Sequence, residues 1–166
     1  FNIVKQFAAE KARAEQELMP LSTRYLGVAG SPANYIFVRW VAQMTAVELH
    51  TVWERFVESR LVAALNASPA VFLKTHSVLG VTRIPKGLAL YIVRGGRRFL
   101  EVRSTRELQS KAVDLVGEVA NPFSALTKTD VQYLDCLAAI RNYVVHGSDA
   151  GAAAYRANLK KCYGIT

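Results

Sequence analysis

The chain has 166 residues, 51% of them apolar, which is enough for one domain with a proper core and argues against an intrinsically disordered protein. Its two cysteines, Cys136 and Cys162, form no CxxC pair, so we expect neither a structural zinc site nor a disulfide framework. Of the net charge of +8, residues 74–111 carry +7, which favours either a polyanionic partner such as nucleic acid or a plain solvated basic face.

Membrane and export signals are not apparent in the sequence. The longest apolar runs, such as residues 88–93, are far shorter than a membrane span, and charged residues interrupt the first 20 positions. We therefore expect no transmembrane helix, no signal-peptide core and a cytoplasmic location. The chain begins with Phe1 rather than methionine, which is consistent with a trimmed fragment.

Helical patterns dominate the first half of the chain. Residues 1–18 are typical of a helix that stops near Pro20. A long helix is expected to begin at Pro32, because proline suits a first helical turn, and to end at residues 66–69. Five residues at helical spacing should form its buried stripe: Ala42, Ala46, Leu49, Trp53 and Phe56.

The segment 79–96 is different in character, because glycines and prolines surround the β-prone run 88–93. It predicts a basic loop or small hairpin inserted between the helices. Five arginines in and after this segment are the expected RNA-binding residues: Arg94, Arg97, Arg98, Arg103 and Arg106. Tyr91 and Phe99 are candidates for stacking on bases.

Three further helices are expected after residue 103. They run from a capping box of Ser104 and Glu107 to about residue 119, from a cap at Thr127 to His146, and from Ser148 or Asp149 to about residue 161. Four or five helices with short connections predict an all-α fold, an antiparallel bundle that forms a single domain over residues 1–166.

The helix that ends at His146 carries unusual polar groups in its last turns. Asn142 and His146 are four residues apart and can touch, whereas Arg141 lies about 140° round an ideal helix from His146 and must curl back to reach it. A buried arginine there would need a carboxylate. Three glutamates on the long helix are candidates for that role: Glu54, Glu58 and, third, Glu48.

The run Arg141-Asn142-Tyr143-Val144-Val145-His146 resembles the mark of the HEPN superfamily, an arginine and a histidine separated by four to six residues at a helix end. Residues 46–65 are similar to the acid-bearing helix that packs against the motif helix in that family. The resemblance covers about residues 34–162 except for 79–96. Ser148 stands where some HEPN toxins carry a tyrosine that a partner enzyme modifies, so that route of regulation is in doubt.

The resemblance implies a ribonuclease that needs no metal and no cofactor. A homodimer would place two motifs at one cleft, and attack by the RNA 2′-OH would leave a 2′,3′-cyclic phosphate. Histidine titrates near neutral pH, so His146 suits proton transfer. Arg141 offers a planar fork to phosphate, and Asn142 can orient the imidazole or bind phosphate.

A toxin or defence-type effector with an antitoxin or regulatory partner fits this family. Two alternatives remain open. One is a non-catalytic HEPN-like module for RNA or nucleotide binding or for dimerisation. The other is that Arg141 and His146 are ordinary structural residues, as His50, four residues before Glu54, is expected to be.

Overall fold

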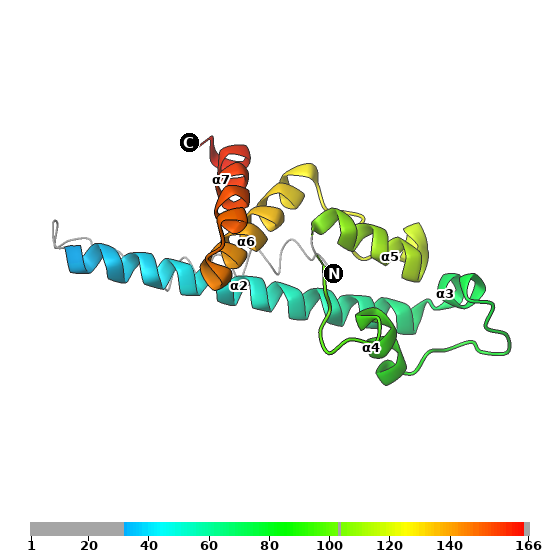
Figure 1. Cartoon of the computed structure of the whole chain (residues 1–166). Helices are drawn as coiled ribbons and strands as arrows, with labels where there is room; N and C mark the ends of the chain where they lie inside the picture. The colour runs from blue at the N-terminus through cyan, green and yellow to red at the C-terminus, as the bar shows by residue number, and fades with distance from the viewer. Residues whose placement is uncertain (1–31, 103, 165–166) are drawn as a thin grey trace. The chain divides into compact units, whose positions relative to one another are not determined.

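The computed structural model describes residues 32–102 and 104–164, with side chains from residue 36 onward (Figure 1). Regular structure in these ranges consists of helices: α2 (Pro32–Ala67), α3 (Ala70–Thr75), α4 (Lys86–Arg94), α5 (Thr105–Ala120), α6 (Lys128–His146) and α7 (Asp149–Tyr163). The prediction of an all-α fold is confirmed for this part of the chain. The helix expected at residues 1–18 and the expected RNA-binding residue Arg103 lie outside the described residues. Among the described helices, none is long and apolar enough to cross a membrane.

The chain divides into two compact units, Phe1–Thr45 and Ala46–Thr166, and the boundary falls inside α2. The described part of the first unit is the opening of α2. Its large apolar side chains are exposed: Ile36, Phe37, Trp40 and Met44. Ala42, which the sequence placed in the buried stripe, is exposed as well.

The core of the second unit is built on the α2 residues Trp53, Val57, Leu61 and Leu65, all of them buried. Trp53 meets the buried ring of Phe123 edge-on, with centroids 6.2 Å apart. The predicted stripe is therefore confirmed at Trp53, whereas its members Ala46, Leu49 and Phe56 are only half-buried. Trp53, Val57, Leu61 and Leu65 follow one another in steps of four, and each such step turns by about 40° beyond one full turn. The buried face of α2 therefore shifts gradually round the helix, whereas the predicted stripe, with steps of three and four residues, would have stayed on one side.

Helix α4 takes the place of the loop or small hairpin that the sequence predicted within 79–96; residues 79–85 form a loop before it, and residues 95–96 form a turn after it. The helix starts after Pro85 and stops at Gly95, which adopts the left-handed conformation (φ 62°, ψ 36°). Ala89 and Val93 are four residues apart and fully buried. The β-prone run is helical because this i, i+4 pair reaches the core and because a proline and a glycine bound one helical segment.

The N-terminal ends of α5, α6 and α7 have the cap residues predicted for them, and the half of the Ser104–Glu107 box that the Ser104 side chain provides is present. Ser104 Oγ accepts a hydrogen bond from the Glu107 amide, and Thr127 with Asp130 forms a reciprocal capping box at the start of α6. Gly147 ends α6 in the left-handed conformation and donates its amide to the Tyr143 carbonyl. Ser148 then caps α7 through the amide of Gly151. The Arg141–His146 segment is thus held at a sharply defined helix end.

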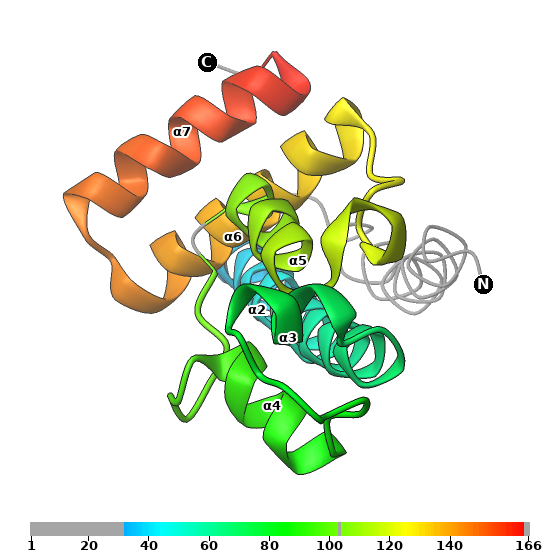
Figure 2. The same cartoon turned by 90° about the vertical axis from the view of Figure 1, so that its right-hand side faces the viewer.

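Helix α7 runs back along α6, as Figure 2 shows. The rings of Tyr143 and Tyr155 stack with centroids 5.0 Å apart and planes 2° from parallel. A Cβ atom on Gly151 would lie 3.1 Å from Ser148 Oγ and 3.6 Å from the Tyr143 backbone. This close approach fixes where α7 leaves α6, directly beside the motif.

A kink in α5 was not predicted. Gly117 interrupts the helix with φ 78° and ψ 169°, and α3, a short helix that the sequence analysis did not anticipate, packs against α5 at this point. A Cβ on Gly117 would lie 3.0 Å from Cγ2 of Val71. Glycine is therefore required there both for its backbone conformation and for the approach of α3.

Candidate active site

The last turns of α6 bring together the three residues that the motif singled out. Nη1 of Arg141 donates to Oδ1 of Asn142 at 3.0 Å and lies 3.3 Å from Nε2 of His146. Arg141 is half-buried, whereas Asn142 and His146 are exposed. The Arg141 side chain curls towards the helix end and so overcomes the angular separation from His146. The resulting cluster is open to solvent.

This geometry defines the hydrogen-bonding state of His146. A guanidinium can only donate, so Nε2 of His146 must accept in its contact with Nη1 of Arg141. The proton of the neutral ring then sits on Nδ1.

The glutamates expected to neutralise Arg141 have other positions. Glu58 accepts two hydrogen bonds from Arg94, at 2.6 Å from Nε and 2.7 Å from Nη2, and so ties α4 to α2. Glu54 lies 3.6 Å from Nδ1 of His50, and Glu48 is exposed. Within residues 32–102 and 104–164, no ion pair joins Arg141 to a carboxylate. Because Arg141 is only half-buried, water can solvate its guanidinium without a carboxylate partner.

His50 is a residue whose proximity to the site the sequence analysis missed. Burial lowers the pKa of His50 below its usual value of 6.5, the charge of Glu54 acts in the opposite direction, and the charge of Arg141 lowers it further. Arg141 therefore acts electrostatically on the imidazole of His50 on α2 and contacts that of His146 at the end of α6. Sequence spacing revealed the pairing of His50 with Glu54, but only the packing of α2 against α6 reveals its link to Arg141.

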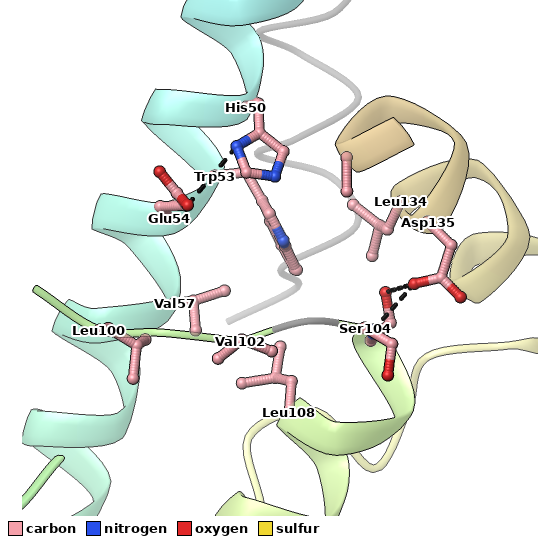
Figure 3. Close-up of a pocket in the computed structure, with 12 residues that line it drawn as sticks. His50, Trp53, Glu54, Val57, Leu100, Val102, Ser104, Leu108, Leu134 and Asp135 are labelled. Carbon is pink, nitrogen blue, oxygen red and sulfur yellow. Dashed lines mark hydrogen bonds and ion pairs between the residues drawn. The ribbon is translucent and has the colours of Figure 1, made fainter. Parts of the chain in front are cut away.

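A small cavity lies between α2, α5 and α6, and His50 lines it whereas the three motif residues do not (Figure 3). His50, Trp53 and Val57 line it from α2, and Leu134 and Asp135 line it from α6. Its volume of about 40 Å³ gives room for water rather than for a nucleobase. Asp135 accepts two hydrogen bonds from Thr105, one from its amide and one from its hydroxyl, each at 2.8 Å. These bonds fix α6 against the start of α5.

The basic segment divides into arginines with carboxylate partners and arginines that face solvent. Arg94 is taken up by Glu58, and Arg97 pairs with Glu101. The guanidinium of Arg98 lies 5.2 Å from the centre of the Phe99 ring, and both residues are exposed. Arg106 is exposed on the first turn of α5. Thus Arg94 stabilises the α2–α4 contact, while Arg98 and Arg106 remain the better placed for an anionic ligand.

Comparison with known proteins found no family model, no curated protein and no solved structure that matches this chain. In the part of the chain that the structure describes, there is no group of three or more histidine, cysteine, aspartate or glutamate residues that could hold a metal ion. What the α6 end can do chemically therefore has to be inferred from its own side chains.

Proposed function

We propose that the protein is a metal-independent endoribonuclease of the HEPN type that acts as a homodimer. The observation that carries this proposal is the contact of Arg141 with both Asn142 and His146 at a solvent-exposed helix end. A structural arginine in this position would be expected to bind a carboxylate, yet in the described residues Arg141 has none. A cation without an anionic partner, beside an imidazole, is suited to a phosphate group.

The proposed reaction follows from the acceptor state of His146. Nε2 removes the proton from a 2′-OH, whose oxygen attacks the adjacent phosphorus while the bond from phosphorus to the 5′-oxygen breaks. Arg141 stabilises the charge that grows on the phosphoryl oxygens, and Asn142 holds the guanidinium through its Oδ1. The products are a 2′,3′-cyclic phosphate and a 5′-hydroxyl, to which a second acid must donate a proton.

The homodimer supplies that second acid in this proposal. One chain places one histidine in the motif, and a two-fold axis beside the α6 end would bring a second His146 to the same phosphate in protonated form. The exposed Arg98 and Arg106 would hold the RNA backbone, and the exposed rings of Tyr91 and Phe99 would stack on unpaired bases. The preferred substrate is accordingly single-stranded RNA.

A nuclease of this kind would need restraint in the cell. We propose a cytoplasmic toxin or defence-type effector, and an antitoxin or regulatory partner that blocks the exposed α6 end. An unrestrained site that cleaves cellular RNA would harm its host, and the exposure of His146 gives such a partner direct access to it.

The second candidate is a non-catalytic module that binds RNA or nucleotide or that dimerises. It is favoured by one observation: the solvent-facing Arg98 over the exposed Phe99 ring, a combination that suits a base and a phosphate without any turnover. In this alternative the Arg141–His146 contact would simply complete the end of α6.

The two candidates are separated by incubating the protein with end-labelled RNA in EDTA. The variants are Arg141→Ala and His146→Ala, and the matched controls are Arg156→Ala on α7 and His76→Ala at the end of α3, both at exposed positions. The nuclease proposal requires cleavage by the wild type and both controls, and its loss in both motif variants with RNA binding retained. Binding without cleavage in every sample favours the module.

A further inference from the structure

Two free thiols meet where α7 packs on α6. Cys136 of α6 is buried, and Cys162 of α7 is half-buried. The Sγ of Cys162 lies 3.3 Å from the carbonyl oxygen of Gln132. That carbonyl is the one to which the Cys136 amide bonds along α6, one turn earlier in the helix. Cys162 therefore lies over the turn of α6 that leads to Cys136, near enough to raise the pKa of the Cys136 thiol.

Helix α7 packs along α6 at the surface of the molecule. None of its residues is buried. Its aromatic contacts with α6 lie near its middle, where Tyr155 stacks on Tyr143, and at its C-terminal end, where Tyr163 approaches Tyr133 with ring centroids 5.8 Å apart. A helix that buries no side chain opens locally at little cost in free energy. A covalent link at its C-terminal end would therefore change its stability more than it would change that of the core helices.

We propose that Cys136 and Cys162 form a reversible intramolecular disulfide that fastens α7 to α6 when the thiol pool becomes oxidised. The co-reactant is a small disulfide such as oxidised glutathione. In a reducing compartment, disulfides of this kind are transient, which fits a modification that follows redox conditions rather than a permanent structural bridge. This inference does not depend on the proposed nuclease activity.

The two thiols have different parts in the exchange. Burial, and next the neighbouring Cys162, raise the pKa of Cys136 to about 11, so Cys136 reacts slowly at first. The thiolate of the more accessible Cys162 attacks oxidised glutathione, forms a mixed disulfide and releases one glutathione. This step removes the ionisable thiol beside Cys136 and with it one cause of the raised pKa.

The second exchange closes the bridge. The Cys136 thiolate attacks Sγ of Cys162 in the mixed disulfide, a sulfur–sulfur bond forms between the two helices, and the second glutathione leaves as thiolate. Overall, two protein thiols are oxidised while one oxidised glutathione is reduced to two reduced molecules. Excess reduced glutathione reverses both steps.

The test is peptide mapping of the whole protein after treatment with oxidised glutathione, with free thiols alkylated under denaturing conditions. We expect a cross-linked peptide pair that contains Cys136 and Cys162 in monomeric protein, and its loss after reduction. In Cys136→Ala, the glutathione adduct should persist on Cys162, because the resolving thiol is missing. The proposal is overturned by a wild type that keeps glutathione on Cys162 with Cys136 unmodified, or by cross-linking through Cys162 between chains.

Hydrogen exchange provides a second test that needs only the wild-type protein, so it can be done even if Cys136→Ala does not fold. After oxidation, the amides of α7 should exchange more slowly, by about tenfold, while those of α4, which contains no cysteine, should be unchanged. An oxidised protein whose α7 amides exchange as fast as before would show that the bond does not fasten the helix, and this too would overturn the proposal.

Discussion

Nη1 of Arg141 lies 3.3 Å from Nε2 of His146, although the two residues are five positions apart and about 140° round an ideal helix. The contact is possible because His146 is the last residue of α6 and Gly147 turns the chain immediately after it. A guanidinium can only donate, so in a hydrogen bond between them the imidazole nitrogen accepts, and neither side chain is buried.

Substitution of Arg141 should separate the effect of charge from that of shape. We expect Arg141→Ala to lower the rate of RNA cleavage by about 10²–10³-fold, the usual loss on removal of a group that stabilises transition-state charge. Arg141→Lys keeps the charge but loses the planar fork, so its cleavage rate should lie between those of the wild type and Arg141→Ala. Single-turnover kinetics on one RNA would measure both. Equal rates for Arg141→Ala and the wild type would rule out a role for this guanidinium.

The environment of His50 can be measured by NMR titration of its ring. Because Arg141 lowers the pKa of His50 and Glu54 raises it, Arg141→Ala should raise that pKa and Glu54→Gln should lower it. Arg141→Lys is the matched control and should leave it nearly unchanged. No movement of the His50 pKa in Arg141→Ala would mean that α2 and α6 do not bring these two side chains together.

The lowered pKa of His50 also predicts how the free energy of unfolding depends on pH. The unfolded chain takes up a proton at about the ordinary value of 6.5, whereas folded His50 takes it up only at lower pH. The unfolded state therefore binds more protons below pH 6.5, and the free energy of unfolding should fall as the pH drops through this range. His50→Gln should lack this part of the fall, as denaturant melts at several pH values would show. Glu54, Arg141 and Asp135 face the same region, so these three residues have to be the same in the two proteins that are compared.

Gly117 gives a test of the fold that is independent of function. Gly117→Ala places a Cβ 3.0 Å from Val71 in a backbone conformation that L-residues rarely adopt, so the free energy of unfolding should fall by about 1–3 kcal/mol. Gly87→Ala, in α4 with open space around it, should instead stabilise the protein by about 0.4–1 kcal/mol. Urea unfolding measures both; similar effects at the two glycines would contradict the kink in α5.

Much of this architecture could be predicted from local sequence patterns. The caps of α5, α6 and α7 depend on side chains within three residues of the helix start, so Ser104, Thr127 and Ser148 identified them without any knowledge of packing. The same holds for Gly147 at the end of α6. The motif cluster could be anticipated because its members lie within one and a half turns of a single helix.

Tertiary contacts account for what could not be predicted. The run 88–93 has strand propensity, yet the burial of Ala89 and Val93 makes it helical, and propensity does not reveal which residues will meet a core. The pairing of Glu58 with Arg94, 36 residues away, likewise cannot be inferred from spacing. For this reason the sequence alone left three glutamates as candidate partners for Arg141, with Glu48 the third.

The basic segment should show two kinds of arginine. The variants are made in a His146→Ala background, which prevents cleavage. Arg98→Ala should weaken RNA binding, and the slope of the logarithm of the binding constant against the logarithm of the salt concentration should become shallower by about one unit. Arg98→Ala should leave the melting temperature unchanged. Arg94→Ala should instead lower the melting temperature, because Glu58 loses its partner. Fluorescence anisotropy at several salt concentrations distinguishes the two; an equal loss of affinity in both variants would contradict this division.

The proposed cleavage mechanism is tested most directly by measuring whether a single phosphodiester bond is cut in the presence of EDTA. Two oligonucleotides are compared that differ only in the 2′ position of the nucleotide preceding the cleaved bond, which is ribose in one and deoxyribose in the other. If Arg141 and His146 act on a 2′-OH nucleophile, the ribose bond will be cut to leave a 2′,3′-cyclic phosphate and the deoxyribose bond will remain intact. Cleavage of both bonds at similar rates would contradict the proposed mechanism.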